Sequence, residues 1–157
     1  ALLTGTRLQT VLVIHANHAQ EIDANVANAL SLLRTTGITL LNQAVLLHGV
    51  NDSTAVLTDL SETLFRHGAL PYYLHLLDKA AGTAHFDVPL PQALVLYEEL
   101  RAALPGYLLP RMVREQAGKA AKLSAIQKTE DRGQRTEFPV LFPLSSVLCS
   151  YAGLASI

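Results

Sequence analysis

Cysteine is nearly absent from the chain, whose 157 residues include one, Cys149. A single thiol excludes an internal disulfide framework and a CxxC pair for a metal, and it suits a reducing compartment, so we expect a cytoplasmic protein. An excess of either charge is also missing, because 12 basic and 13 acidic residues give a net charge of -1. Nucleic acid and anionic lipid both require a basic surface, so we expect neither as a partner.

The two ends lack recognisable targeting segments. The amino-terminal residues have no charged region or small-residue cleavage site of a secretory signal. They also have no initiator methionine, so we expect the sequence to begin within a longer protein. Residues 138–157 are uncharged and about long enough to span a bilayer. Pro139, Pro143 and four serines make this stretch a poor spanning helix, and a membrane anchor is not expected.

Half of the residues are hydrophobic, and over most of the chain they recur in a regular order. Short apolar runs of strand type occupy residues 10–17, 38–47, 69–77 and 106–113, spaced as in βαβ units. The segments between them have the apolar spacing and caps of amphipathic helices. The expected helix and cap residues are Ile22, Val26, Ala29, Leu30, Leu33 and Gly37, then Asp52, Ser53, Val56, Leu57, Leu60, Leu64 and Gly68, then Pro91, Leu94, Tyr97, Leu100, Leu104 and Gly106.

Apolar strands that alternate with helices predict an α/β fold, with a parallel sheet covered by helices. Three βα units and a final strand are about half of a closed eight-unit barrel. The pattern therefore allows an open sheet or part of a barrel, and unpaired strand edges would favour pairing with another chain or copy. Residues 1–122 contain this pattern, whereas residues 123–157 form an unassigned tail.

Ligands of parallel α/β proteins bind where the strands end at their carboxyl sides. Histidines at these ends would suit a metal-dependent barrel hydrolase. Strand alternation separates His18 from His15, however, which favours hydrogen-bonding roles over a metal site. The same alternation places Tyr72 and His75 on opposite faces of the third strand. The polar residues near the strand ends are His15, Asn17, His18, Asn42, Gln43, the stretch from His48 to Asp52, His75, Asp78 and, in the following loop, His85.

Lysine is scarce, and two of the four lysines, Lys119 and Lys122, lie in the small-residue stretch AGKAAK. A lysine there could form a Schiff base with an aldehyde cofactor, or the stretch could simply be an exposed loop. Asp78 and Glu115 follow neighbouring strands. They could bind an ammonium group between them or act as an acid and base pair, although a helix cap or a surface ion pair would also explain them.

Four motifs occur together in one order and spacing, namely VLVIHANHAQEID, GITLLNQAVLLHGVND, LPYYLHLLDKAAGTAHFDVP and LPGYLLPRMVREQAGKAAK. In this respect the chain, from Thr6 to Lys122, closely resembles the C-terminal half of the lysine 2,3-aminomutase family. The resemblance is strongest to the branch responsible for β-lysylation of elongation factor P. It implies a radical S-adenosylmethionine (SAM) enzyme on a partial α/β barrel, with a 4Fe-4S cluster and pyridoxal 5'-phosphate (PLP). Such an enzyme moves the α-amino group of L-lysine to the β-carbon.

The resemblance also implies roles for individual residues. Lys122 matches the lysine that holds PLP. Asp78 matches the first of two carboxylates that bind the distal ammonium of the substrate, and Glu115 falls where the lysine-degrading branch has an aspartate as the second. Gln43 and His15 match residues that line the SAM pocket.

The chain departs from the family in one major respect, because the CxxxCxxC motif that holds the cluster is missing. This chain by itself is therefore not expected to bind the cluster. Glu115 and the stretch GKAAK favour the elongation factor P branch, whose product, β-lysine, is attached to that factor by a separate ligase. Two interpretations remain: a truncated aminomutase that keeps the PLP and lysine half of the site, or a non-catalytic fragment or degenerate relative with an α/β core.

Overall fold

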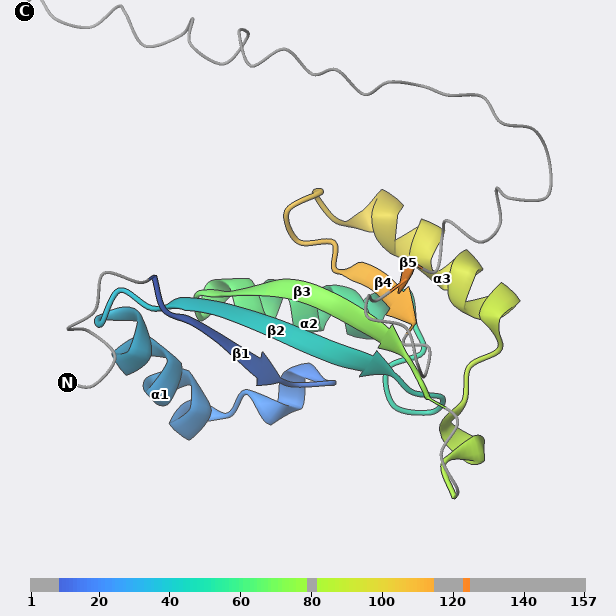
Figure 1. Cartoon of the computed structure of the whole chain (residues 1–157), viewed down its shortest axis with the longest axis horizontal. Coiled ribbons are helices and arrows are strands. Elements are labelled where there is room, and N and C mark those ends of the chain that lie inside the picture. Colours follow the sequence, from blue (N-terminus) through green and yellow to red (C-terminus); the bar gives the residue numbers. More distant parts are fainter. Residues whose placement is uncertain (1–8, 79–81, 115–122, 125–157) are drawn as a thin grey trace, which may run out of the picture.

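The structure, a computed structural model, describes residues 9–78, 82–114 and 123–124 (Figure 1). Strands and helices alternate as the apolar pattern predicts, and short 3-10 turns follow the first and third strands. The elements are β1 (Val11–His15), η1 (Ala19–Glu21), α1 (Ala24–Arg34), β2 (Thr39–Leu46), α2 (Thr54–Arg66), β3 (Ala69–Leu76), η2 (Ala84–Phe86), α3 (Leu90–Ala103), β4 (Arg111–Arg114) and β5 (Leu123–Ser124).

One five-stranded sheet in the order β1-β2-β3-β4-β5 organises the described residues. Strands β1 to β4 run parallel and β5 is antiparallel to β4, which confirms the predicted α/β fold. The fourth strand begins at Arg111, five residues later than predicted. The reason is local: Leu108 N–H donates to Pro105 O at 2.9 Å and closes a turn there. Strand β5 was not predicted, because two residues show no periodicity.

Polar caps and left-handed glycines set the helix ends. Helix α1 begins after Asp23, whose carboxylate accepts from Val26 N–H at 2.8 Å. Of the two predicted caps of α2, the structure selects Ser53. Gly37 and Gly68 end the first two helices with φ of 76° and 84°, a region that side-chain-bearing residues avoid. Ala29, predicted on the buried face of α1, is exposed.

The two faces of the sheet differ in burial. On β2 the alternate residues Leu40, Asn42, Ala44 and Leu46 are buried. The apolar members of this set join a core with residues of α2 and α3, such as Leu57, Leu64 and Leu100. The intervening residues, among them Gln43 and Val45, are only half-buried. One face is therefore packed against helices while the other remains partly open.

Strand β1 lies at the edge of the sheet (Figure 1). Among the described residues its only strand partner is β2. Val11, Leu12 and Val13 are exposed by 50%, 37% and 40%, unusually high values for a parallel strand, which is normally covered on both faces. An open apolar edge of this kind is what a partial barrel presents.

A β-bulge interrupts β3 opposite the middle of β2. Asn42 pairs with Pro71 and Gln43 pairs with Tyr73, so Tyr72 is the inserted residue. The rings of Tyr72 and Tyr73 lie 3.8 Å apart between centroids, and the Tyr72 hydroxyl donates to that of Tyr73 at 2.9 Å. Tyr73 in turn meets the edge of His75. The prediction that alternation separates Tyr72 from His75 is therefore wrong, because alternation fails at an inserted residue.

Within the described residues, no helix is long and apolar enough to cross a membrane. Residues 138–157, the uncharged stretch considered above, lie outside that part of the chain, as does most of the tail 123–157.

Candidate functional site

The predicted site residues that the structure describes lie at the end of β1, within β2 and beyond the end of β3. His15 ends β1 and is paired in register with Gln43 of β2. Their side chains meet, with 2.5 Å between Gln43 Nε2 and His15 Nε2. The roles in this contact depend on the tautomer of the ring: the Gln43 amide nitrogen can donate to Nε2 when the ring proton is on Nδ1. The structure thus brings together the two residues that sequence comparison assigned to one pocket.

Asp78 lies two residues beyond the end of β3 and is exposed. Its predicted partner Glu115 and the lysines Lys119 and Lys122 lie outside the described residues. The ammonium clamp formed by Asp78 and Glu115, and the role of Lys122, therefore stay predictions. What the structure adds is the position of Asp78, on the strand that follows the one bearing Gln43 in the sheet.

Asparagine side chains replace direct backbone pairing between β1 and β2 beyond His15, where β1 ends. Asn42 Oδ1 accepts from Ala16 N–H at 2.8 Å, and Asn42 Nδ2 donates to Ala16 O at 3.1 Å. One position further, Asn17 Oδ1 accepts from Val45 N–H at 2.8 Å. Beyond His15 the chain is therefore linked to β2 through asparagine side chains instead of direct backbone bonds, and we call this region the strand fork.

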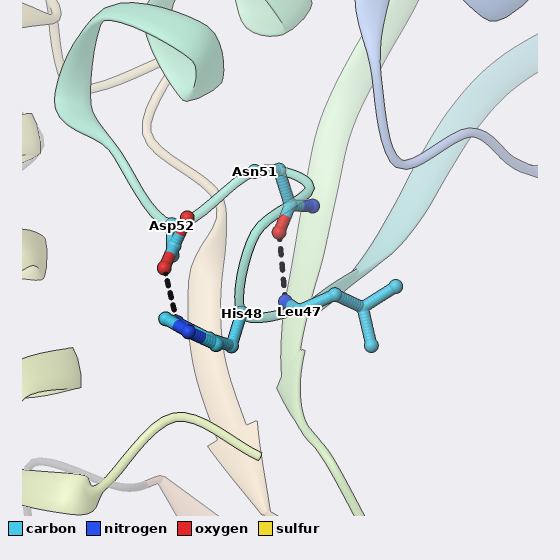
Figure 2. Close-up of polar contacts among 4 residues, drawn as sticks. All are labelled: Leu47, His48, Asn51 and Asp52. Carbon is cyan, nitrogen blue, oxygen red and sulfur yellow. Dashed lines mark hydrogen bonds and ion pairs between the residues drawn. The ribbon is translucent and has the colours of Figure 1, made fainter. Parts of the chain in front are cut away.

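Asn51, in the loop after β2, places its side chain between the two sides of this fork. Its side chain is fully buried, and Nδ2 donates to Asn17 O and to Val45 O, each at 2.9 Å. Its Oδ1 accepts from Leu47 N–H at 2.7 Å (Figure 2). The sequence places Asn51 in the polar stretch 48–52 near the end of β2 but predicts no role for it, because an asparagine before a helix is usually an exposed turn residue.

The loop that carries Asn51 also holds a histidine and carboxylate pair. His48 Nδ1 lies 2.7 Å from Asp52 Oδ2 (Figure 2). Partial burial raises the pKa of Asp52, but hydrogen bonds from the Gly49 backbone and the His48 ring outweigh it and hold that pKa below its ordinary value. His48 N–H donates to Phe86 O at 2.9 Å, which ties this loop to the one after β3.

The other histidines have structural contacts. His18 Nδ1 accepts from Gln20 N–H at 3.2 Å, and Glu21 Oε1 accepts from the backbone N–H groups of Asn17 and His18. Across residues 9–78, 82–114 and 123–124, no three histidine, cysteine or carboxylate side chains come together as metal ligands. The described geometry therefore gives the metal hydrolase interpretation no support.

Comparison with solved structures defines the class of fold. A radical SAM methyltransferase from Sphaerobacter thermophilus superposes with a TM-score of 0.54 and 17% sequence identity, over 74% of this chain and 37% of that one. This similarity shows the fold alone, an α/β arrangement in which the sheet forms part of a barrel. No protein-family model matches the chain.

Curated relatives define the family. L-lysine 2,3-aminomutase of Haemophilus influenzae is 50% identical over 121 residues, that of Buchnera aphidicola 46% over 122, and that of Escherichia coli K12 48% over 115. These matches cover 77%, 78% and 73% of the chain. The chain belongs to the lysine 2,3-aminomutase family. It spans about a third of the length of these relatives, 36%, 36% and 34% respectively.

The iron-sulfur cluster of radical SAM enzymes needs several thiolate ligands. The only cysteine here is Cys149. The residues of this chain therefore do not fit the cluster, and no step of a mechanism within the chain can use it.

Proposed function

We propose that the chain is the lysine-binding and PLP-binding part of a lysine 2,3-aminomutase, an enzyme that converts L-lysine to β-lysine. The observation that carries the proposal is the identity of 46–50% to relatives named L-lysine 2,3-aminomutase, extending over most of the chain. The contact between His15, at the carboxyl end of β1, and Gln43 supports it, because ligands of parallel α/β folds bind near the carboxyl ends of the strands.

Each proposed role follows from side-chain chemistry. Lys122 holds PLP, which supplies an aldehyde that forms a carbon-nitrogen double bond with an amine. Asp78 and Glu115 accept hydrogen bonds from the distal ammonium of lysine, which selects a substrate of that length. His15 and Gln43 contact SAM. The cluster that cleaves SAM has to be supplied by protein outside this chain, because the ligands are absent here.

We assign the activity to elongation factor P modification in the cytoplasm, with a separate ligase attaching the β-lysine. Glu115 in place of aspartate and the stretch GKAAK support this branch over lysine degradation. The apolar edge at β1, which has no second strand partner within the described part of the chain, supports association with a second polypeptide or a second copy, since exposed strand edges pair readily.

Covalent labelling tests the central claim. The folded chain is incubated with PLP, reduced with borohydride and digested for peptide mapping. The label should be found on Lys122, and the Lys122→Ala variant should lose it. Lys119→Ala is the matched control, three residues away in the same stretch, and should label like the original chain.

Two results would contradict the assignment. Equal labelling of Lys122→Ala would exclude Lys122 as the PLP residue. A folded chain that takes no label would instead support the interpretation as a non-catalytic fragment or degenerate relative, which the single cysteine also favours.

A further inference from the structure

The contact between His15 and Gln43 needs an explanation beyond the two side chains themselves. His15 is exposed and Gln43 half-buried. A hydrogen bond between exposed side chains adds little net free energy and restricts both rotamers. Such a contact is maintained only if the backbone beneath each residue holds the two side chains at bonding distance, so its geometry depends on how the ends of β1 and β2 are fixed.

Three asparagines fix those ends. Asn42 binds both backbone groups of Ala16, the residue directly after His15. Asn17 binds Val45 N–H, two residues after Gln43. Asn51, without solvent exposure, joins the two sides of the fork. Beyond the His15 and Gln43 pair, the hydrogen bonds that join the two strands in the described residues each have one of these asparagine side chains as donor or acceptor.

We propose that Asn17, Asn42 and Asn51 are positioning residues of the candidate site: they hold the strand fork at the width at which Gln43 donates to His15 Nε2. This fixes the neutral His15 ring with its proton on Nδ1 and presents that N–H at the edge of the sheet. The consequence for catalysis rests on the proposed function, in which His15 and Gln43 contact SAM.

The tautomer of His15 is a direct readout, because ¹⁵N chemical shifts of labelled histidine distinguish a proton on Nδ1 from one on Nε2. In the full chain without ligand, His15 should carry its proton mainly on Nδ1. In Asn17→Ala and Asn51→Ala the ratio of the Nδ1–H to the Nε2–H form should fall about fivefold, the equivalent of one ordinary hydrogen bond. Gln43→Ala removes the side chain that contacts His15 and supplies the reference spectrum of His15 without this hydrogen bond.

Two controls separate positioning from general stability. Asn17→Asp keeps an acceptor oxygen for Val45 N–H and should restore the His15 signal that Asn17→Ala loses. Asn28→Ala removes an exposed asparagine of α1 and should leave the signal unchanged. If Asn51→Ala does not fold, the two Asn17 variants decide the question.

The proposal is wrong if His15 in the original chain carries its proton on Nε2. It is also wrong if Asn17→Ala and a folded Asn51→Ala keep the original His15 signal, since the amides would then only stabilise the strand ends. Because no ligand is present, either result is independent of whether PLP labels Lys122, and it can be told apart from a failure of the proposed function.

Discussion

Replacing Asn42 by alanine should destabilise the fold by an amount that the structure allows us to work out. The side chain is 2% exposed and makes two hydrogen bonds, both to the backbone of Ala16. Alanine removes both and leaves a buried N–H and a buried C=O without these partners. At about 1 kcal/mol for each bond, plus part of the penalty for unsatisfied groups, the free energy of unfolding should fall by about 2 to 3 kcal/mol.

Urea unfolding followed by circular dichroism measures this change. With a slope typical of small domains, the midpoint should move down by about 1 to 2 M urea while the slope itself stays the same. Asn42→Asp should be worse than alanine, because it buries a charge and turns an oxygen toward Ala16 O in place of the donor. The exposed Asn28→Ala is the control and should change stability by no more than about 0.5 kcal/mol. A urea midpoint for Asn42→Ala equal to that of Asn28→Ala would refute the reasoning, since the Asn42 side chain would then not substitute for backbone hydrogen bonds between the strands.

Two further predictions concern single sites. The pKa of Asp52 is lower in the folded chain than its reference of 3.8, so its stabilising effect is present above that reference and is lost as the pH falls through the folded value. Between about pH 5 and about pH 3 the original chain should therefore lose more stability than Asp52→Asn, as measured by urea midpoints at both pH values; equal losses would show that the contacts of Asp52 with the Gly49 backbone and His48 have no energetic weight. At Gly68, with φ of +84°, an added Cβ would meet the flexible side chain of Arg34 and strain the left-handed backbone, whereas nothing lies within 4 Å of such an atom at Gly106. Gly68→Ala should cost about 1 to 2 kcal/mol of unfolding free energy and Gly106→Ala less than about 0.5, and a thermal melt in which the two variants coincide would contradict this account.

The strand and helix pattern was predictable because it is local. Apolar spacing within ten or so residues is enough to distinguish β2 from α2, and caps such as Ser53 lie next to the helices that they begin. The later start of β4 shows the limit of this reasoning, since an apolar run also includes the turn that precedes a strand.

The candidate site was predictable in part. Strand-end reasoning and family resemblance selected His15, Gln43 and Asp78; the structure pairs His15 with Gln43 and puts Asp78 two residues beyond β3, and the roles of all three stay predictions. The structural role of Asn51 was not predictable, because its partners are Asn17, 34 residues away, and Val45 and Leu47 at the end of β2. No local pattern distinguishes a buried asparagine of this kind from an exposed one.

The amino-acid sequence by itself determined the fold class and the family, because periodicity and identity are both properties of the linear chain. The tertiary structure alone decided the register of β1 with β2, the inserted Tyr72 in β3 and the amide-filled fork. These features depend on which strands become neighbours and how far each slides along the next. A shift of one residue moves every side chain to the other face, so their chemistry is settled only when the sheet is assembled.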